Sequence, residues 1–183
     1  MIEKHVTWGD FESLTDNIVK DIMGRKELFK GQVSNKFNWV ISINRGGLVP
    51  GIMLANKLGS KHAVVSVSSP KERNSKERGV IKTDLYLSQT ELIMGWQNIL
   101  IVDNISRTGE SLKSALRSSK RCDPDIKNVA FATLHCSKSS PFKPEYFGEL
   151  IGEDVWINYP WEQNSPKLVV LKSELQEQIT AVG

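Results

Sequence analysis

Hydrophobic residues follow two alternating patterns along this chain: short apolar runs, and longer stretches with helical spacing. Runs of four to six apolar residues are typical of strands buried on both faces; they occupy residues 39–43, 63–67, 98–102 and 129–134. Between them, 48–58 and 112–119 have helical spacing, and Gly59 is a natural C-cap for the first. Strands alternating with helices predict an α/β protein whose parallel sheet is covered on both faces.

Helices are also expected near both ends of the chain. Thr7 followed by Asp10 resembles a capping box, and apolar residues then recur at helical spacing to about residue 23. A last helix is expected from Pro166, with leucine and isoleucine on one face.

Three segments have neither the strand pattern nor the helix pattern. We expect residues 24–37, which are polar, and 68–79, which are charged, to form loops. Residues 138–162 combine aromatic residues with three prolines, which predicts an irregular cap.

Composition narrows the class of protein. A chain of 183 residues without an internal repeat or a linker suits one domain. The 24 basic and 21 acidic residues nearly balance, so the net charge of +3 is weak evidence for nucleic acid, and a small anionic substrate fits as well. No apolar run approaches the roughly 20 residues of a membrane helix, and none near the start is typical of a signal peptide. We therefore expect a cytoplasmic protein.

The most informative segment chemically is residues 98–112, NILIVDNISRTGESL. A buried strand places Asp103 at its carboxyl end, where open α/β sheets bind ligands. A short loop then opens a helix, whose N-terminal N–H groups favour a phosphate. The hydroxyl and glycine residues of that loop are Ser106, Thr108, Gly109 and Ser111. An acid beside a phosphate loop points to a sugar phosphate, although an ordinary strand–loop–helix corner accounts for the same residues equally well.

Three motifs together resemble one known family. Residues 98–112 resemble the signature that binds 5-phosphoribosyl 1-pyrophosphate (PRPP) in type I phosphoribosyltransferases. Residues 42–51, SINRGGLVPG, are similar to the pyrophosphate loop of its xanthine–guanine and hypoxanthine branch. Residues 155–162, VWINYPWE, resemble the base-binding hood of the bacterial xanthine–guanine enzymes. The motifs appear in the order that the family has.

The resemblance implies a fold and an activity. The fold is a Rossmann-like open parallel sheet in a single domain, residues 1–183, with a flexible lid at about 68–82 and a small irregular hood at about 137–165. The implied activity is transfer of ribose 5-phosphate from PRPP to a 6-oxopurine (guanine, xanthine or hypoxanthine) with Mg²⁺, releasing pyrophosphate. A homodimer or homotetramer is expected.

Roles for individual residues follow from the resemblance. It implies catalytic roles for Asp103, Arg107 and Arg45, and a cis or otherwise strained peptide between Asn44 and Arg45. The expected PRPP-binding residues are Arg45, Gly46, Asp103, Asn104, Ser106, Arg107, Thr108, Gly109 and Ser111. Lys138, Trp156 and Ile157 are the expected base-binding residues. Asn104 and Glu162 are the expected metal ligands.

The chain departs from the family pattern at three positions. Asn104 replaces the second acid of the signature, and an amide is a weaker Mg²⁺ ligand than a carboxylate. Arg107 stands where this branch usually has an acid near purine N7, and arginine stays protonated, so it cannot be a general base. Asn158 replaces a hood acid that would recognise the purine 2-substituent. The alternative hypothesis is therefore a regulatory protein on the same fold that binds PRPP or a nucleotide with little or no catalysis. A phosphate-binding α/β domain outside the family is the third hypothesis.

Overall fold

The computed structural model describes residues 2–25, 37–68, 82–86 and 97–162. The expected lid, most of the 24–37 loop and the helix expected from Pro166 lie outside the described residues. In the part that is described, no helix is long and apolar enough to cross a membrane.

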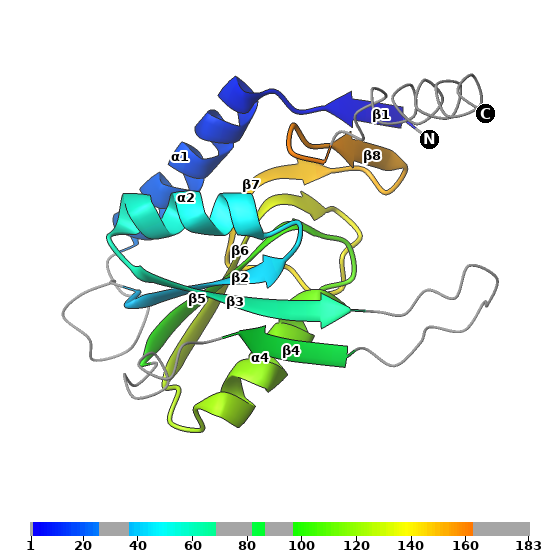
Figure 1. Cartoon of the computed structure of the whole chain (residues 1–183). Helices are drawn as coiled ribbons and strands as arrows, with labels where there is room; N and C mark the ends of the chain where they lie inside the picture. Colours follow the sequence, from blue (N-terminus) through cyan, green and yellow to red (C-terminus); the bar gives the residue numbers. More distant parts are fainter. Residues whose placement is uncertain (1, 26–36, 69–81, 87–96, 163–183) are drawn as a thin grey trace, which may run out of the picture.

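The main sheet has six described strands in the order β4-β3-β2-β5-β6-β7. Each pairs in parallel with its neighbour except β4, which runs antiparallel to β3. The bounds are β2 Trp39–Asn44, β3 Lys61–Ser68, β4 Lys82–Tyr86, β5 Asn98–Ser106, β6 Asn128–Ser137 and β7 Tyr146–Ile151. A separate parallel pair, β1 Ile2–His5 with β8 Val155–Asn158, lies beside this sheet (Figure 1).

Helices cover both faces of the sheet, as the alternation predicts. Helices α1 (Trp8–Gly24) and α2 (Leu48–Leu58) lie on one face, and α4 (Glu110–Cys122) lies on the other (Figure 1). The expected capping box at the start of α1 is confirmed, because Thr7 and Asp10 each accept a hydrogen bond from the other's backbone N–H.

Alternate residues of the central strands supply two hydrophobic cores. In β5, Leu100 and Val102 face the α1–α2 side, whereas Ile99 and Ile101 face α4. Both faces of the strand are buried, so its sequence is a continuous apolar run without the polar alternation of a one-sided strand. The four strands predicted from apolar runs are therefore confirmed. Each strand is up to four residues longer than the run that predicted it.

The segment expected to be an irregular cap, 138–162, is irregular only in part, because it contains two strands. Its middle forms β7, which extends the main sheet beyond β6, and its later part forms β8, which pairs with the start of the chain. In β7 the side chains are buried only at Tyr146 and Ile151, so the strand has no apolar run and no clear alternation. Strands β1 and β4 were also not predicted, because each is short and polar.

Candidate functional site

Two of the sequence motifs meet at the carboxyl ends of the adjacent strands β2 and β5. The loop after β2 contains Gly46 and Gly47, and it lies directly against the end of β5. A Cβ atom on Gly46 would stand 2.6 Å from the side chain of Asn104, and one on Gly47 would stand 2.4 Å from the carbonyl oxygen of Val102. The approach to a backbone carbonyl therefore needs glycine at position 47, whereas a Cβ on Gly46 would require the Asn104 side chain to move. The peptide bond between Asn44 and Arg45 is cis, which confirms that expectation.

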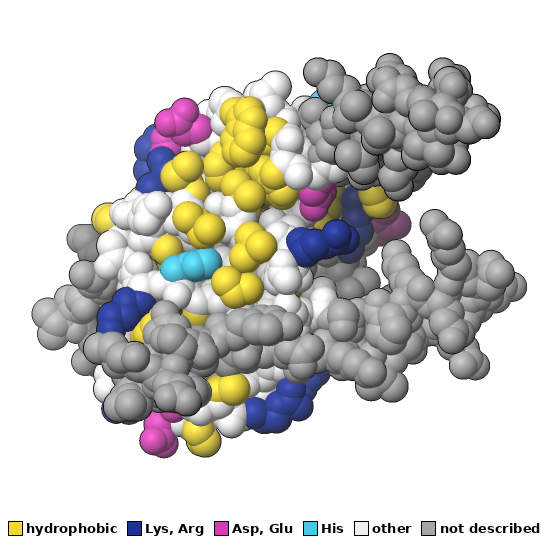
Figure 2. All heavy atoms as spheres, in the orientation of Figure 1, with side chains coloured by type: hydrophobic (Ala, Val, Ile, Leu, Met, Phe, Trp, Pro, Cys, Tyr) yellow, Lys and Arg dark blue, Asp and Glu magenta, His cyan; other side chains and the backbone are white. Residues whose placement is uncertain are grey.

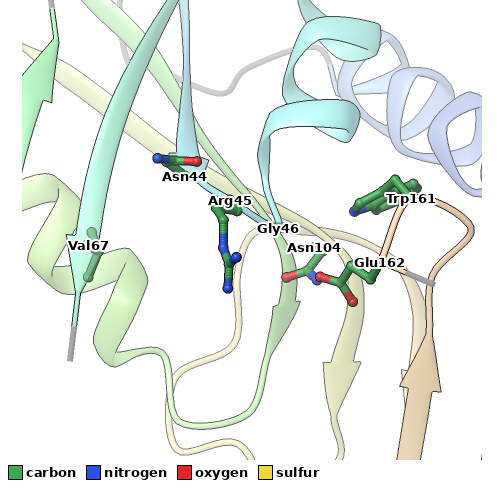
Figure 3. A pocket seen from close by; sticks show the side chains of 7 residues that line it. All are labelled: Asn44, Arg45, Gly46, Val67, Asn104, Trp161 and Glu162. Atoms are coloured by element: carbon green, nitrogen blue, oxygen red, sulfur yellow. The ribbon is translucent and has the colours of Figure 1, made fainter. Parts of the chain in front are cut away.

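A cavity of about 680 Å³ opens at this edge of the sheet (Figure 3). Its lining comes from the β2–α2 loop, β3, β5 and the segment after β8, and consists of Asn44, Arg45, Gly46, Val67, Asn104, Trp161 and Glu162. Four residues singled out from the sequence are thus brought together: Arg45, Gly46, Asn104 and Glu162. They belong to three motifs that are far apart in the chain.

Asn104 and Glu162 form a hydrogen bond across this cavity. The amide Nδ2 of Asn104 donates to Oε1 of Glu162 at 3.0 Å. Partial withdrawal from water raises the pKa of the Glu162 carboxyl, and the nearby Arg45 guanidinium opposes that rise. Figure 3 shows Arg45 extending into the same cavity. The site thus combines one cation, one carboxylate and an amide within a short distance.

Asp103 lies directly beside the cavity lining and is 8% exposed. Burial raises the pKa of its carboxyl to about 7, because the charged form loses solvation. The backbone N–H of Asn104 donates to this carboxyl at 2.9 Å and lowers the pKa, while the negative charge of Glu162 raises it. Near neutral pH, Asp103 is therefore poised between its neutral and ionised forms.

The loop between β5 and α4 has the geometry expected of an anion-binding helix start. Gly109 adopts a left-handed conformation with φ of 74° and precedes the first residue of α4. A Cβ atom there would stand 2.4 Å from Phe142, so the close contact also requires glycine. Ser106 donates its hydroxyl to the Phe142 carbonyl at 3.2 Å, whereas Thr108 and Ser111 are half-buried. Phe142 thus supports the loop from the side.

Arg107 points from this loop to the turn between β7 and β8. Its guanidinium donates to the carbonyl oxygens of Glu153 at 3.3 Å and of Val155 at 2.5 Å. These contacts lie outside the lining of the cavity.

The three expected base-binding residues also lie outside that lining. Trp156 is 53% exposed, and its indole N–H donates to Asn158 at 3.1 Å. Ile157 is buried in the α1–α2 core, and Lys138 has an exposed side chain. An exposed aromatic ring is available for stacking on a planar ligand. Within the described part of the hood, Trp156 thus offers an exposed aromatic face, but it does not line the cavity.

Two buried residues behind the site were assigned no role from the sequence. The hydroxyl of Tyr159 donates to the carbonyl oxygen of Asn104 at 2.9 Å, and Nδ1 of His135 lies 2.9 Å from the same hydroxyl. Burial lowers the pKa of His135 to about 4 and raises that of Tyr159, so both are neutral at pH 7. They hold the Asn104 backbone in place without adding charge to the site.

The cavity also presents oxygen atoms that could bind a metal ion. Among the described residues, no group of three or more His, Cys, Asp or Glu side chains could hold an ion alone. The Glu162 carboxylate and the Asn104 amide oxygen are hard oxygen donors. They suit a cation such as Mg²⁺ that takes one or two protein ligands and the rest from substrate and water.

Comparison with known proteins agrees with these motifs. Residues 12–162 match the family model described as the phosphoribosyl transferase domain. The chain is 29% identical over 162 residues to the xanthine-guanine phosphoribosyltransferase of Cereibacter sphaeroides, over 86% of each chain. The purine phosphoribosyltransferase of Pyrococcus horikoshii is similar in structure, with a TM-score of 0.67 and 22% identity over 90% of this chain and 97% of that one. The Helicobacter pylori xanthine-guanine-hypoxanthine phosphoribosyltransferase has a TM-score of 0.69 and 21% identity, over 93% and 99% of the two chains.

Proposed function

We propose, since this chain belongs to the phosphoribosyl transferase domain family, that it transfers ribose 5-phosphate from PRPP to a 6-oxopurine base and releases pyrophosphate. The observation that carries the proposal is the meeting of the Arg45–Gly46 loop with Asn104 and Glu162 around one cavity. That cavity lies beside the loop that leads to α4, and the N-terminus of this helix, capped by Gly109, suits a phosphate. A sugar carrying phosphates at both ends fits this arrangement.

PRPP is held in this proposal by two loops. Arg45 and Gly46 take the pyrophosphate, the arginine by charge and the glycine by letting the backbone approach. The 5′-phosphate binds the loop of Ser106, Thr108, Gly109 and Ser111, and Asp103 with Asn104 bonds the ribose hydroxyls. Ionisation of Asp103 is favoured when hydroxyl donors or a cation arrive, because each stabilises the charged carboxylate.

The base is assigned to the exposed hood. Trp156 stacks on the purine ring, Ile157 offers backbone groups to the base edge, and Lys138 donates to the 6-oxygen. An ammonium group has donors but no acceptor, so it favours a 6-oxo group over a 6-amino group. The similarity to the Cereibacter enzyme, named for xanthine and guanine, supports this base class.

Charge stabilisation is the main source of rate in this mechanism. Pyrophosphate leaves as positive charge develops on the ribose carbon, so Arg45 stabilises the departing negative charge while Asp103 lies near the forming cation. Asn104 and Glu162 would hold Mg²⁺, which supplies further charge neutralisation to the pyrophosphate when bound. The partners are thus PRPP and a purine base, and we propose a cytoplasmic homodimer or homotetramer.

A panel of bases tests this function. With PRPP and Mg²⁺, guanine, xanthine or hypoxanthine should stimulate pyrophosphate release, and adenine should give little, because Lys138 cannot accept a hydrogen bond from its 6-amino group. Pyrophosphate is measured continuously with a coupled assay, and chelation of Mg²⁺ should stop the release. Preference for adenine over all three oxopurines would remove Lys138 from the base site.

A further inference from the structure

Arg107 links the loop after β5 to the start of β8. It follows the end of β5, in the loop that leads to α4, yet both of its described hydrogen bonds reach the β7–β8 turn, about fifty residues later in the chain. One acceptor, Val155, is the first residue of β8, and the other, Glu153, lies in the turn before it. A single guanidinium therefore connects the phosphate loop to the strand that carries Trp156.

The strand that receives this contact is not a member of the main sheet. β8 pairs only with β1 among the described strands, over Ile2↔Val155 to His5↔Asn158. Its connections to the main body include the burial of Ile157, the ion pair of Lys4 in β1 with Glu149 in β7, and the hydrogen bond from Tyr159, directly after β8, to the Asn104 carbonyl. Arg107 differs from these in that it reaches the start of β8 from the phosphate loop.

We infer that Arg107 is a positioning residue that fixes the base-binding strand β8 to the phosphate loop, and that it acts neither as a general base nor as a phosphate ligand. The effect of Arg107 on enzyme kinetics rests on the proposed function, because it requires that the protein binds PRPP and a base. The guanidinium presents several N–H donors in a planar fork, which lets it reach two carbonyl oxygens in the same turn. Ordering of the loop by a 5′-phosphate then steadies Trp156, so PRPP and the base strengthen each other's binding.

Hydrogen exchange tests the link without requiring activity. Arg107→Met keeps most of the side-chain stem and removes every donor. In the absence of ligand, the amides of residues 153–158 should exchange about tenfold faster in this variant than in the parent, because charge-assisted hydrogen bonds are lost. The exchange rates of amides 99–102, in the core of β5, should stay unchanged. Arg117→Met is the matched control, because Arg117 donates to Ser114 within α4. Unchanged exchange at 153–158 in Arg107→Met overturns the inference.

Kinetics separate positioning from phosphate binding. In Arg107→Met the KM for hypoxanthine or guanine should rise about tenfold, with the KM for PRPP changed by about twofold or less. Arg107→Lys retains the charge but not the fork, so it should remain impaired for the base. A rise confined to the KM for PRPP, rescued by lysine, would make Arg107 a phosphate ligand and contradict the inference. If the parent releases no pyrophosphate at all, the proposed function fails, and the exchange experiment still decides the link.

Discussion

Asp103→Asn is expected to lower kcat/KM for PRPP by about 10²-fold or more while the fold is retained. The substitution keeps the shape and the oxygen that accepts the Asn104 N–H, but removes the carboxylate. Because Asn104 already replaces the second acid, Asp103 is the one carboxylate left of the acid pair in the signature. A charge-assisted hydrogen bond to a ribose hydroxyl contributes about 1.5–3 kcal/mol, and stabilisation of the developing cation adds to that.

The measurement is steady-state pyrophosphate release as PRPP is varied, with far-ultraviolet circular dichroism to check the fold. Asp125→Asn is the matched control, since Asp125 is an exposed carboxylate in the loop after α4. Its kinetics should equal those of the parent. Parent-like kinetics in Asp103→Asn would place the ribose site elsewhere.

The same substitution should stabilise the protein above pH 7. The carboxyl of Asp103 has a folded-state pKa of about 7 against an ordinary value of 3.8, so the folded state binds more protons than the unfolded state between these pH values. The parent therefore loses stability as pH rises from about 4 to 7, whereas asparagine does not titrate. The gap between the two pKa values corresponds to about 4 kcal/mol, an order-of-magnitude figure at 1.36 kcal/mol per unit.

Urea unfolding at several pH values checks this effect. The free energy of unfolding of Asp103→Asn minus that of the parent should be small near pH 4, grow to pH 7 and level off above it. A difference that does not change between pH 4 and pH 8 would show that the buried carboxyl does not titrate in this range. Together with the kinetic result, this outcome would show that the ionised Asp103 carboxylate lowers the stability of the folded protein but is needed to bind PRPP.

Much of the fold could be predicted because the central strands are buried on both faces. The apolar runs ending at Ile43 and Val102, and the helices between them, follow from hydrophobic spacing alone. Two of the strands that were missed, β1 and β8, depend on partners far away in the chain. β1 is exposed and polar, and it becomes a strand because β8, about 150 residues later, offers its edge.

The site could be predicted where a motif is continuous in the sequence. Arg45, Gly46, Asn104 and Glu162 were named from three motifs, and the fold places them around one cavity. The hydrogen bond from Asn104 to Glu162 explains how the amide fits a position where an acid is usual: a second carboxylate would repel Glu162. The support from Tyr159 and the reach of Arg107 to the hood could not be predicted, because both are contacts between distant segments.

The most direct test of the central claim is to follow both products of one reaction. Purified protein with PRPP, Mg²⁺ and radiolabelled hypoxanthine, guanine or xanthine should form the labelled nucleoside 5′-monophosphate, resolved by chromatography, in equal amount to the pyrophosphate released. This equality distinguishes transfer to the base from hydrolysis of PRPP. Binding of PRPP or a purine nucleotide by calorimetry, with no labelled nucleotide formed from any of the three bases, would contradict transfer and identify a binding protein on this fold.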